Sequence, residues 1–304
     1  MADKTKIASR SLFRTAGHCY ALRIACAALG LLLLAGCSVQ PGHDDGQRPN
    51  TVLVLGSLHG YMLAHPHYSL PVFVAAIERF RPDVILTEVR VGHPGPLEGS
   101  IDGGIEQTLV YAMGDLRGYA VVPADWFDDD FVAAMMKDDP VRRPEIEAAL
   151  ASVRTQYQEV IAGGSFEALQ GESTQTLVRK LYKLEDLDGG GLMARRNERV
   201  CQNIVGQLGK LHGKRVLVVF GLDHKYFLDD CVRQHGDQVA APPDVSGATS
   251  LPRDVRDRAV AYVLDSKAML QARLASGYYS TTLAKRVTDK LAAFDRWIGK
   301  LTAK

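Results

Sequence analysis

Hydrophobic residues along this chain fall into two patterns, short continuous runs and longer stretches with helical spacing. Four short runs, rich in β-branched residues, are typical of strands buried on both faces: Thr51–Leu55, Val84–Val89, Tyr119–Val122 and Arg215–Phe220. Apolar residues recur at helical spacing over 69–80 and again from Ile105 to Leu116. This alternation of strands and helices, joined by short loops, predicts an α/β fold with a mainly parallel central sheet flanked by helices.

The remaining apolar residues are spaced mostly as in helices. Residues 126–190 are predicted to form a helical insertion, and a long helix is expected at about 192–212. Residues 236–251 are rich in Pro, Gly and Asp and are expected to form a loop, whereas the C-terminal tail has one apolar helical face. The sequence therefore predicts a single α/β domain over residues 51–304, with a helical insertion and a helical C-terminal tail.

The N-terminal segment has the pattern of an export signal. Lysine and arginine are its only charged residues up to Arg23, apart from Asp3, and an apolar run follows from Ile24 to Leu34. This run is too short to span a bilayer of ~30 Å as a helix. It ends in Leu34-Ala-Gly-Cys37, which resembles the lipobox of bacterial lipoproteins. The alternative is an ordinary signal peptide with an incidental cysteine.

The lipobox resemblance implies how the chain is processed and where it is located. Residues 1–36 would be removed as a signal peptide, and Cys37 would carry the lipid that anchors the protein to a membrane. Residues 37–50 are polar, with Pro and Gly, and are expected to form a flexible tether. Because Ser38 rather than Asp follows the cysteine, the outer membrane is favoured, with the domain facing the periplasm.

Charge and cysteine content narrow the classes of partner and site. The chain has 36 Lys and Arg against 35 Asp and Glu, so no basic excess indicates a nucleic-acid partner. Cys201 and Cys231 are the two cysteines that remain once the signal peptide is removed and Cys37 is lipidated. The compartment permits a disulfide between them, but two free thiols fit the sequence equally well. No paired-cysteine spacing typical of structural zinc sites occurs.

Two segments of the chain resemble each other. Val52-Leu-Val-Leu-Gly-Ser-Leu-His59 is matched by Val216-Leu-Val-Val-Phe-Gly-Leu-Asp-His224, so each is a buried strand followed by Gly-x-x-His. Glycine permits a sharp turn out of the sheet, and we expect each histidine to project from the loop at the carboxyl end of its strand. Glu88 ends the second strand and Asp125 follows the third. Together they suit a divalent metal with an open position or general acid–base catalysis.

Arg196 is placed unusually for an arginine. It lies three residues after Met193 and four before Val200, on the apolar face of the helix expected at 192–212. A buried guanidinium is costly unless it is paired, so we expect a carboxylate partner, with Glu88 the first candidate and Asp125 the second. The alternative is an arginine whose stem covers apolar surface while its head reaches water.

The order of these motifs resembles the TraB/GumN/Tiki superfamily, which is related to the EreA-like erythromycin esterases and the ChaN-like proteins. The resemblance covers about residues 51–235 and is weak over 126–190. It implies that the two motif histidines are His59 and His224, the strand-end carboxylate Glu88, and the Arg-Asn pair Arg196 and Asn197. Lys225-Tyr226 after the second motif departs from the family pattern, and the departure lies next to His224.

Three functions follow from the resemblance and the residues. The first is a metal-dependent hydrolase of protease or esterase type, acting on a peptide or small ester, with His59, Glu88, His224 and Asp125 holding a divalent metal and Arg196 stabilising the developing anion. The second is a ChaN-like lipoprotein that binds haem or iron without catalysis, for which His65 and His67 (His-Pro-His) would be further ligands. The third is a structural or assembly lipoprotein.

Overall fold

The computed structural model describes residues 48–303, except 94, 128–130, 132–141, 190 and 280. The predicted signal peptide, Cys37 and nearly all of the predicted tether lie outside the described residues. Gly46–Lys304 form one compact unit that contains every described helix and strand. No helix in the described ranges is both long and apolar enough to cross a membrane.

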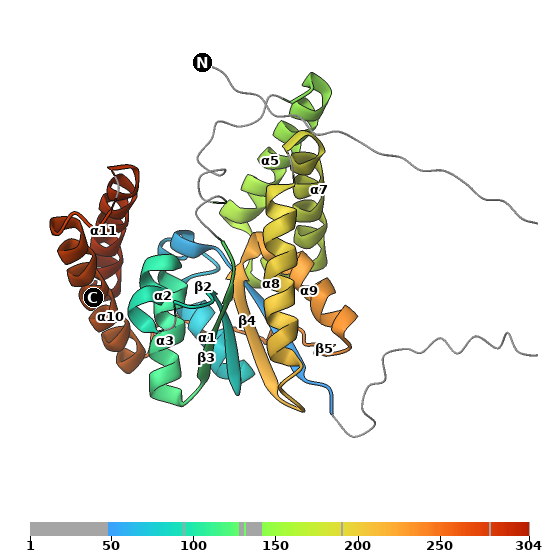
Figure 1. Ribbon diagram of the computed structural model, residues 1–304. Helices are drawn as coiled ribbons and strands as arrows, with labels where there is room; N and C mark the ends of the chain where they lie inside the picture. Colours follow the sequence, from blue (N-terminus) through green and yellow to red (C-terminus); the bar gives the residue numbers. More distant parts are fainter. Residues whose placement is uncertain are drawn as a thin grey trace, which may run out of the picture. The chain divides into compact units, whose positions relative to one another are not determined.

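The centre of this unit is a five-stranded, wholly parallel sheet with strand order β3-β2-β4-β1-β5 (Figure 1). Its strands are β1 Thr51–Ser57, β2 Val84–Arg90, β3 Ala120–Asp125, β4 Arg215–Gly221 and β5 Gln238–Val239. The α/β class and the parallel sheet predicted from the sequence are thus confirmed. The loop predicted at 236–251 is wrong at one point, because β5 pairs with Thr51 and Val52 there. A two-residue strand is too short for any hydrophobic pattern to show it.

Helices connect the strands largely where apolar periodicity predicts them. The structure contains α1 Leu70–Phe80, α3 Ile105–Arg117, α5 Pro144–Gly163, α6 Phe166–Gln170, α7 Glu172–Gly189, α8 Leu192–Leu208, α10 Arg253–Ala275 and α11 Thr281–Thr302. Helix α8 ends earlier than predicted, at the Gly209 C-cap. Three short or unpredicted elements complete the fold: the 3₁₀ helix η1 His59–Leu63, α2 Pro96–Asp102 and α9 Leu222–His235.

Alternate residues of each strand enter two different cores. In β1, Val52 and Val54 pack with residues of α8 and α9, whereas Leu53 and Leu55 belong to the core that α1, α3 and the other helices cover. All four side chains are fully buried. Burial on both faces explains why the strands are continuous apolar runs rather than alternating ones. Figure 1 shows the sheet between α8 and α9 on one side and α2 and α3 on the other.

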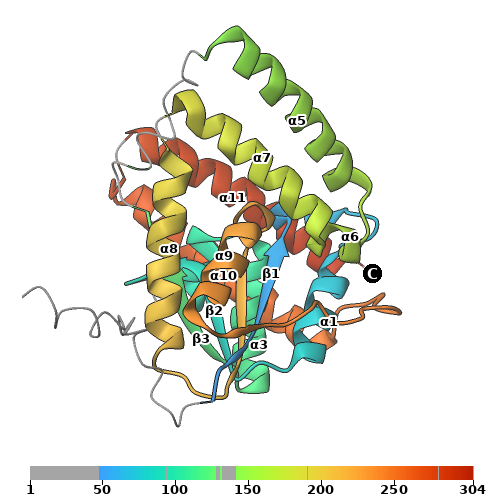
Figure 2. The same cartoon turned by 90° about the vertical axis from the view of Figure 1, so that its right-hand side faces the viewer.

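The helical insertion lies at the carboxyl end of the sheet, where α6 contacts β1 and α7 contacts α9 (Figure 2). On the far side, α10 packs against α2 and α3, and α11 packs against α10. Cys201 of α8 and Cys231 of α9 form a disulfide, which decides between the two alternatives that the sequence left open. The bond joins the two helices that lead into and out of β4.

Candidate functional site

The strand order brings the two Gly-x-x-His motifs together. Strand β4 lies between β1 and β2, so the carboxyl ends of all three strands meet at one edge of the sheet. His59 Nε2 lies 4.0 Å from Glu88 Oε2, and His224 Nε2 lies 3.8 Å from Glu88 Oε1. The prediction that these three side chains come together at one edge of the sheet is confirmed, and their functional roles stay a prediction.

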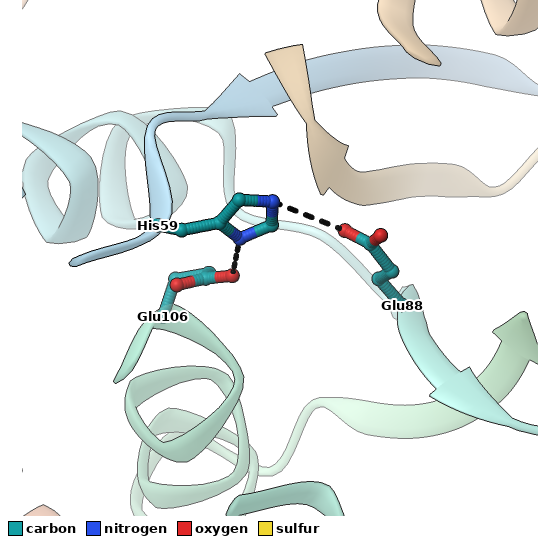
Figure 3. A group of neighbouring side chains, drawn as sticks. All are labelled: His59, Glu88 and Glu106. Atoms are coloured by element: carbon teal, nitrogen blue, oxygen red, sulfur yellow. Dashed lines mark hydrogen bonds and ion pairs between the residues drawn. The ribbon is translucent and has the colours of Figure 1, made fainter. Parts of the chain in front are cut away.

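His59 begins η1, with Leu58 between it and the end of β1, and its backbone has a left-handed φ of 49°. Its ring points between two carboxylates: Nδ1 bonds Glu106 Oε1 at 2.6 Å, and Nε2 faces Glu88 (Figure 3). The side chain is 48% exposed, so a substrate can reach it. Gly221 leaves room for this ring, because a Cβ there would lie 2.7 Å from His59 Nε2. The glycine of the second motif is therefore needed by the histidine of the first.

Glu106 is a member of this group of side chains that the sequence did not indicate. It lies in the first turn of α3 and is fully buried, although an acid there looks like an ordinary helix N-terminal residue. Its Oε1 holds His59, whereas its Oε2 is buried and has no hydrogen-bond partner among the described residues. Gly104 makes space for this carboxylate, since a Cβ there would lie 2.3 Å from Oε2.

Arg196 links the carboxylates beside this pair. Its Nε and Nη2 donate to the two oxygens of Asp125 at 3.1 and 2.7 Å, and Nη2 also donates to Glu88 Oε1 at 2.7 Å. The side chain is only 11% exposed. Burial and pairing with Glu88 and Asp125 are as predicted. The contacts occupy the guanidinium inside the protein, so Arg196 holds Glu88 in place rather than presenting free donors to a substrate.

His224 does not project from a loop, as the sequence reasoning expected. It lies in the first turn of α9, which follows β4 without an intervening loop, and it is buried. Arg196 Nη1 donates to its Nε2 at 3.1 Å, and its Nδ1 donates to Asn197 Oδ1 at 2.5 Å. Both ring nitrogens are therefore occupied by the Arg-Asn pair of α8, which fixes the neutral tautomer.

Charges around the site shift several pKa values. Desolvation opposes protonation of His59, but the carboxylates of Glu106 and Glu88 outweigh it and raise the pKa of His59 to about 10. Burial together with the Arg196 charge lowers the pKa of His224 to about 3. Burial acts against ionisation of Glu88, yet the nearby cations and a hydrogen bond from Gly221 N hold its pKa below the usual range. The two histidines therefore differ in charge at neutral pH.

The side chains that could hold a metal are partly those expected. One ligand atom from each of His59, Glu88 and Glu106 lies within 4.8 Å of the others. Asp125 and His224 were also expected as ligands, but the structure engages both with the Arg196 guanidinium. The group that could bind a cation is thus His59, Glu88 and Glu106, and the Arg196 network lies directly behind it.

Other candidate residues lie apart from this group. Both nitrogens of His65 are used, with Nε2 bonded to Ile161 O at 2.5 Å and Nδ1 accepting from the backbone N–H of Tyr68 and of His67. His65 therefore shapes its loop. The helical insertion also reaches the edge of the site, because the Tyr157 hydroxyl of α5 donates to Asp223, the residue before His224.

Comparisons of the whole chain with protein-family models, curated proteins and solved structures found no match.

Proposed function

We propose that this protein is an exported, lipid-anchored hydrolase that cleaves a peptide or a small ester at the His59–Glu88–Glu106 site. The observation that carries the proposal is the half-exposed imidazole of His59 between two carboxylates, one of them fully buried. A structural histidine would be expected to have both nitrogens satisfied inside the protein, as His224 and His65 have. Nε2 of His59 instead has no hydrogen-bond partner among the described residues, since the Glu88 oxygen that it faces lies 4.0 Å away.

Each residue of the site has a distinct task in this proposal. Glu106 accepts a hydrogen bond from Nδ1–H and fixes the ring. Because His59 is an imidazolium at neutral pH, its Nε2–H donates a proton to the leaving group, and the neutral Nε2 then takes up the proton that the attacking water releases. Glu88 balances the positive charge of the imidazolium. Arg196, a positioning residue, keeps Glu88 ionised and directed at His59 through the bond to Oε1. The arrangement resembles the base-and-orienting-acid pairs of many hydrolases.

A divalent metal ion fits these side chains on two grounds. The three candidate ligand atoms lie within 4.8 Å of one another, and one oxygen of Glu106 is buried without a hydrogen-bond partner among the described residues. His59, Glu88 and Glu106 would hold the ion, whose chemistry would be to lower the pKa of a coordinated water and to polarise a carbonyl oxygen. A cation there would replace the proton that the two carboxylates now hold on His59.

The test is a hydrolase assay combined with metal analysis. The unit from Gly46 to Lys304 is purified, its metal content is measured, and it is assayed with chromogenic esters and a labelled peptide mixture, with and without chelator. We expect activity that His59→Ala abolishes and that His212→Ala, an exposed histidine elsewhere, leaves unchanged. Equal activity of the two variants on every substrate would refute the proposal.

Haem or iron binding was the second hypothesis, and no contact among the described residues favours it over hydrolysis. It rested on the ChaN-like resemblance and the lipid anchor, with His65 and His67 as further ligands, and the nitrogens of His65 are taken by backbone groups. An absorption scan of the same preparation after haem addition tests this hypothesis directly.

A further inference from the structure

A group of basic side chains lies at the amino edge of the sheet, opposite the candidate site. We call it the basic patch and define it as Arg48, Arg81, Lys210, Lys214 and Arg215. All five residues are exposed, and none of them has a carboxylate within ion-pair distance in the described part of the chain. Unpaired cations on one edge make that edge attractive to anions.

Backbone hydrogen bonds bring these residues together. Gly213 N donates to Arg48 O, and Thr51 N donates to Lys214 O, each at 2.8 Å. These bonds join the start of β1 to the loop before β4. Asp83 N donates to Arg215 O at 2.8 Å, which joins the start of β2 to the same loop. The patch therefore follows the amino ends of three adjacent strands, which lie at the lower end of the sheet in Figure 2.

Part of the patch lines a pocket of about 600 Å³, which is bounded by Arg81, Arg215, Arg79 and Glu78. The acid in this pocket is already balanced, because Glu78 accepts from Arg117 Nη2 at 3.1 Å. Arg215 directs its guanidinium to the Phe80 carbonyl, which leaves its charge unneutralised. Asp83 is the nearby exposed acid, and its carboxylate accepts from the Arg215 backbone N–H at 2.9 Å. The pocket thus keeps an excess of positive charge.

We propose that the basic patch binds the phosphate groups of an anionic lipid surface, so that the protein rests on the membrane with its candidate site facing away. Guanidinium groups bind phosphate oxygens through paired, charge-assisted hydrogen bonds. The position of the described chain start supports a membrane as the partner. Arg48 belongs to the patch and comes 11 positions after Cys37, so a lipid on Cys37 would lie at most ~40 Å away.

The choice of a membrane as the partner, and the orientation on it, rest on the proposed lipid anchor, but the patch itself can be tested without the anchor. The unit Gly46–Lys304 is sedimented with vesicles of phosphatidylglycerol and phosphatidylcholine, and with vesicles of phosphatidylcholine alone. The test variant is Arg81→Ala/Lys214→Ala, because neither side chain has a hydrogen bond in the described structure. Arg215 is left intact, since its guanidinium binds the end of α1. The control, Arg195→Ala/Arg199→Ala, removes the same charge from exposed positions near the opposite edge.

We expect salt-sensitive binding to the anionic vesicles and little to the neutral ones. A basic residue at an anionic surface contributes about five-fold to binding, so the test variant should bind about 25-fold more weakly and the control nearly as wild type. Equal loss in both variants, or no preference for anionic vesicles, would overturn the proposal. Titration with inorganic phosphate distinguishes a lipid phosphate from a soluble phosphate as the ligand of the patch. Saturable phosphate binding that Arg81→Ala/Lys214→Ala abolishes, with vesicle binding unchanged, would assign the patch to a soluble anion and also overturn it.

Discussion

Replacing Arg196 with alanine tests the central network of the site most directly. The guanidinium makes three charge-assisted hydrogen bonds to two carboxylates and a fourth to His224, with a side chain only 11% exposed. Its removal takes away the cation between Glu88 and Asp125 and leaves Asp125, which is 1% exposed, without its ion-pair partner. Removing one partner of a buried ion pair costs about 3–5 kcal/mol, which for a domain of this size lowers Tm on the order of 10 °C.

The matched control is Arg195→Ala, one position away on the same helix. Arg195 is exposed, and a surface substitution of this kind changes stability by about 0.5 kcal/mol or less. Thermal and urea unfolding of the two variants measures the difference. Arg196→Lys should recover little stability, because an ammonium group cannot reproduce the planar two-donor contact with Asp125. Equal Tm values for Arg196→Ala and Arg195→Ala would show that the buried network does not hold the site together.

Three further predictions concern the anchor, the metal group and pH. Cys37→Ala should give an unlipidated chain that leaves the membrane fraction, and a variant still firmly membrane-bound would contradict the lipobox interpretation. Glu106→Gln should weaken divalent-metal binding by at least ~10-fold in calorimetry, whereas Glu198→Gln, at an exposed position, should not. The pKa of His224 is about 3 when folded and ~6.5 when unfolded, so the unfolded state binds more protons between these values and stability falls as pH drops below 6.5. In His224→Gln this contribution, up to about 1.4 kcal/mol per pH unit, should be absent. Urea unfolding of the wild type and the variant at pH 7 and pH 5 measures it. The same change in the free energy of unfolding between the two pH values in both proteins would refute the assignment.

Most strands and helices of the sheet were predictable, because local patterns of apolar residues along the sequence indicate them. Continuous apolar runs predict the strands β1, β2 and β4, since each is buried on both faces. The edge strand β3 is only partly buried, and its run is shorter. The parallel arrangement of the strands follows from the helices between them. The site histidines and Glu88 were predictable for the same reason: each follows or ends such a strand, and parallel strands place their carboxyl ends at one edge. Arg196 was found because a charge interrupts the apolar face of its helix.

Only the tertiary structure shows which side chains contact His59 and which contact His224. Glu106 comes from a helix far along the chain from His59, and no local pattern distinguishes a buried helix-start acid from an exposed one. His224 looked equivalent to His59 in sequence, yet α9 begins immediately after β4 and buries its ring against Arg196 and Asn197. Sequence determines that two histidines follow two strands. Packing determines that one is a buried, neutral support and the other a half-exposed imidazole between two carboxylates, because burial and charge depend on neighbours that the chain brings together only when folded.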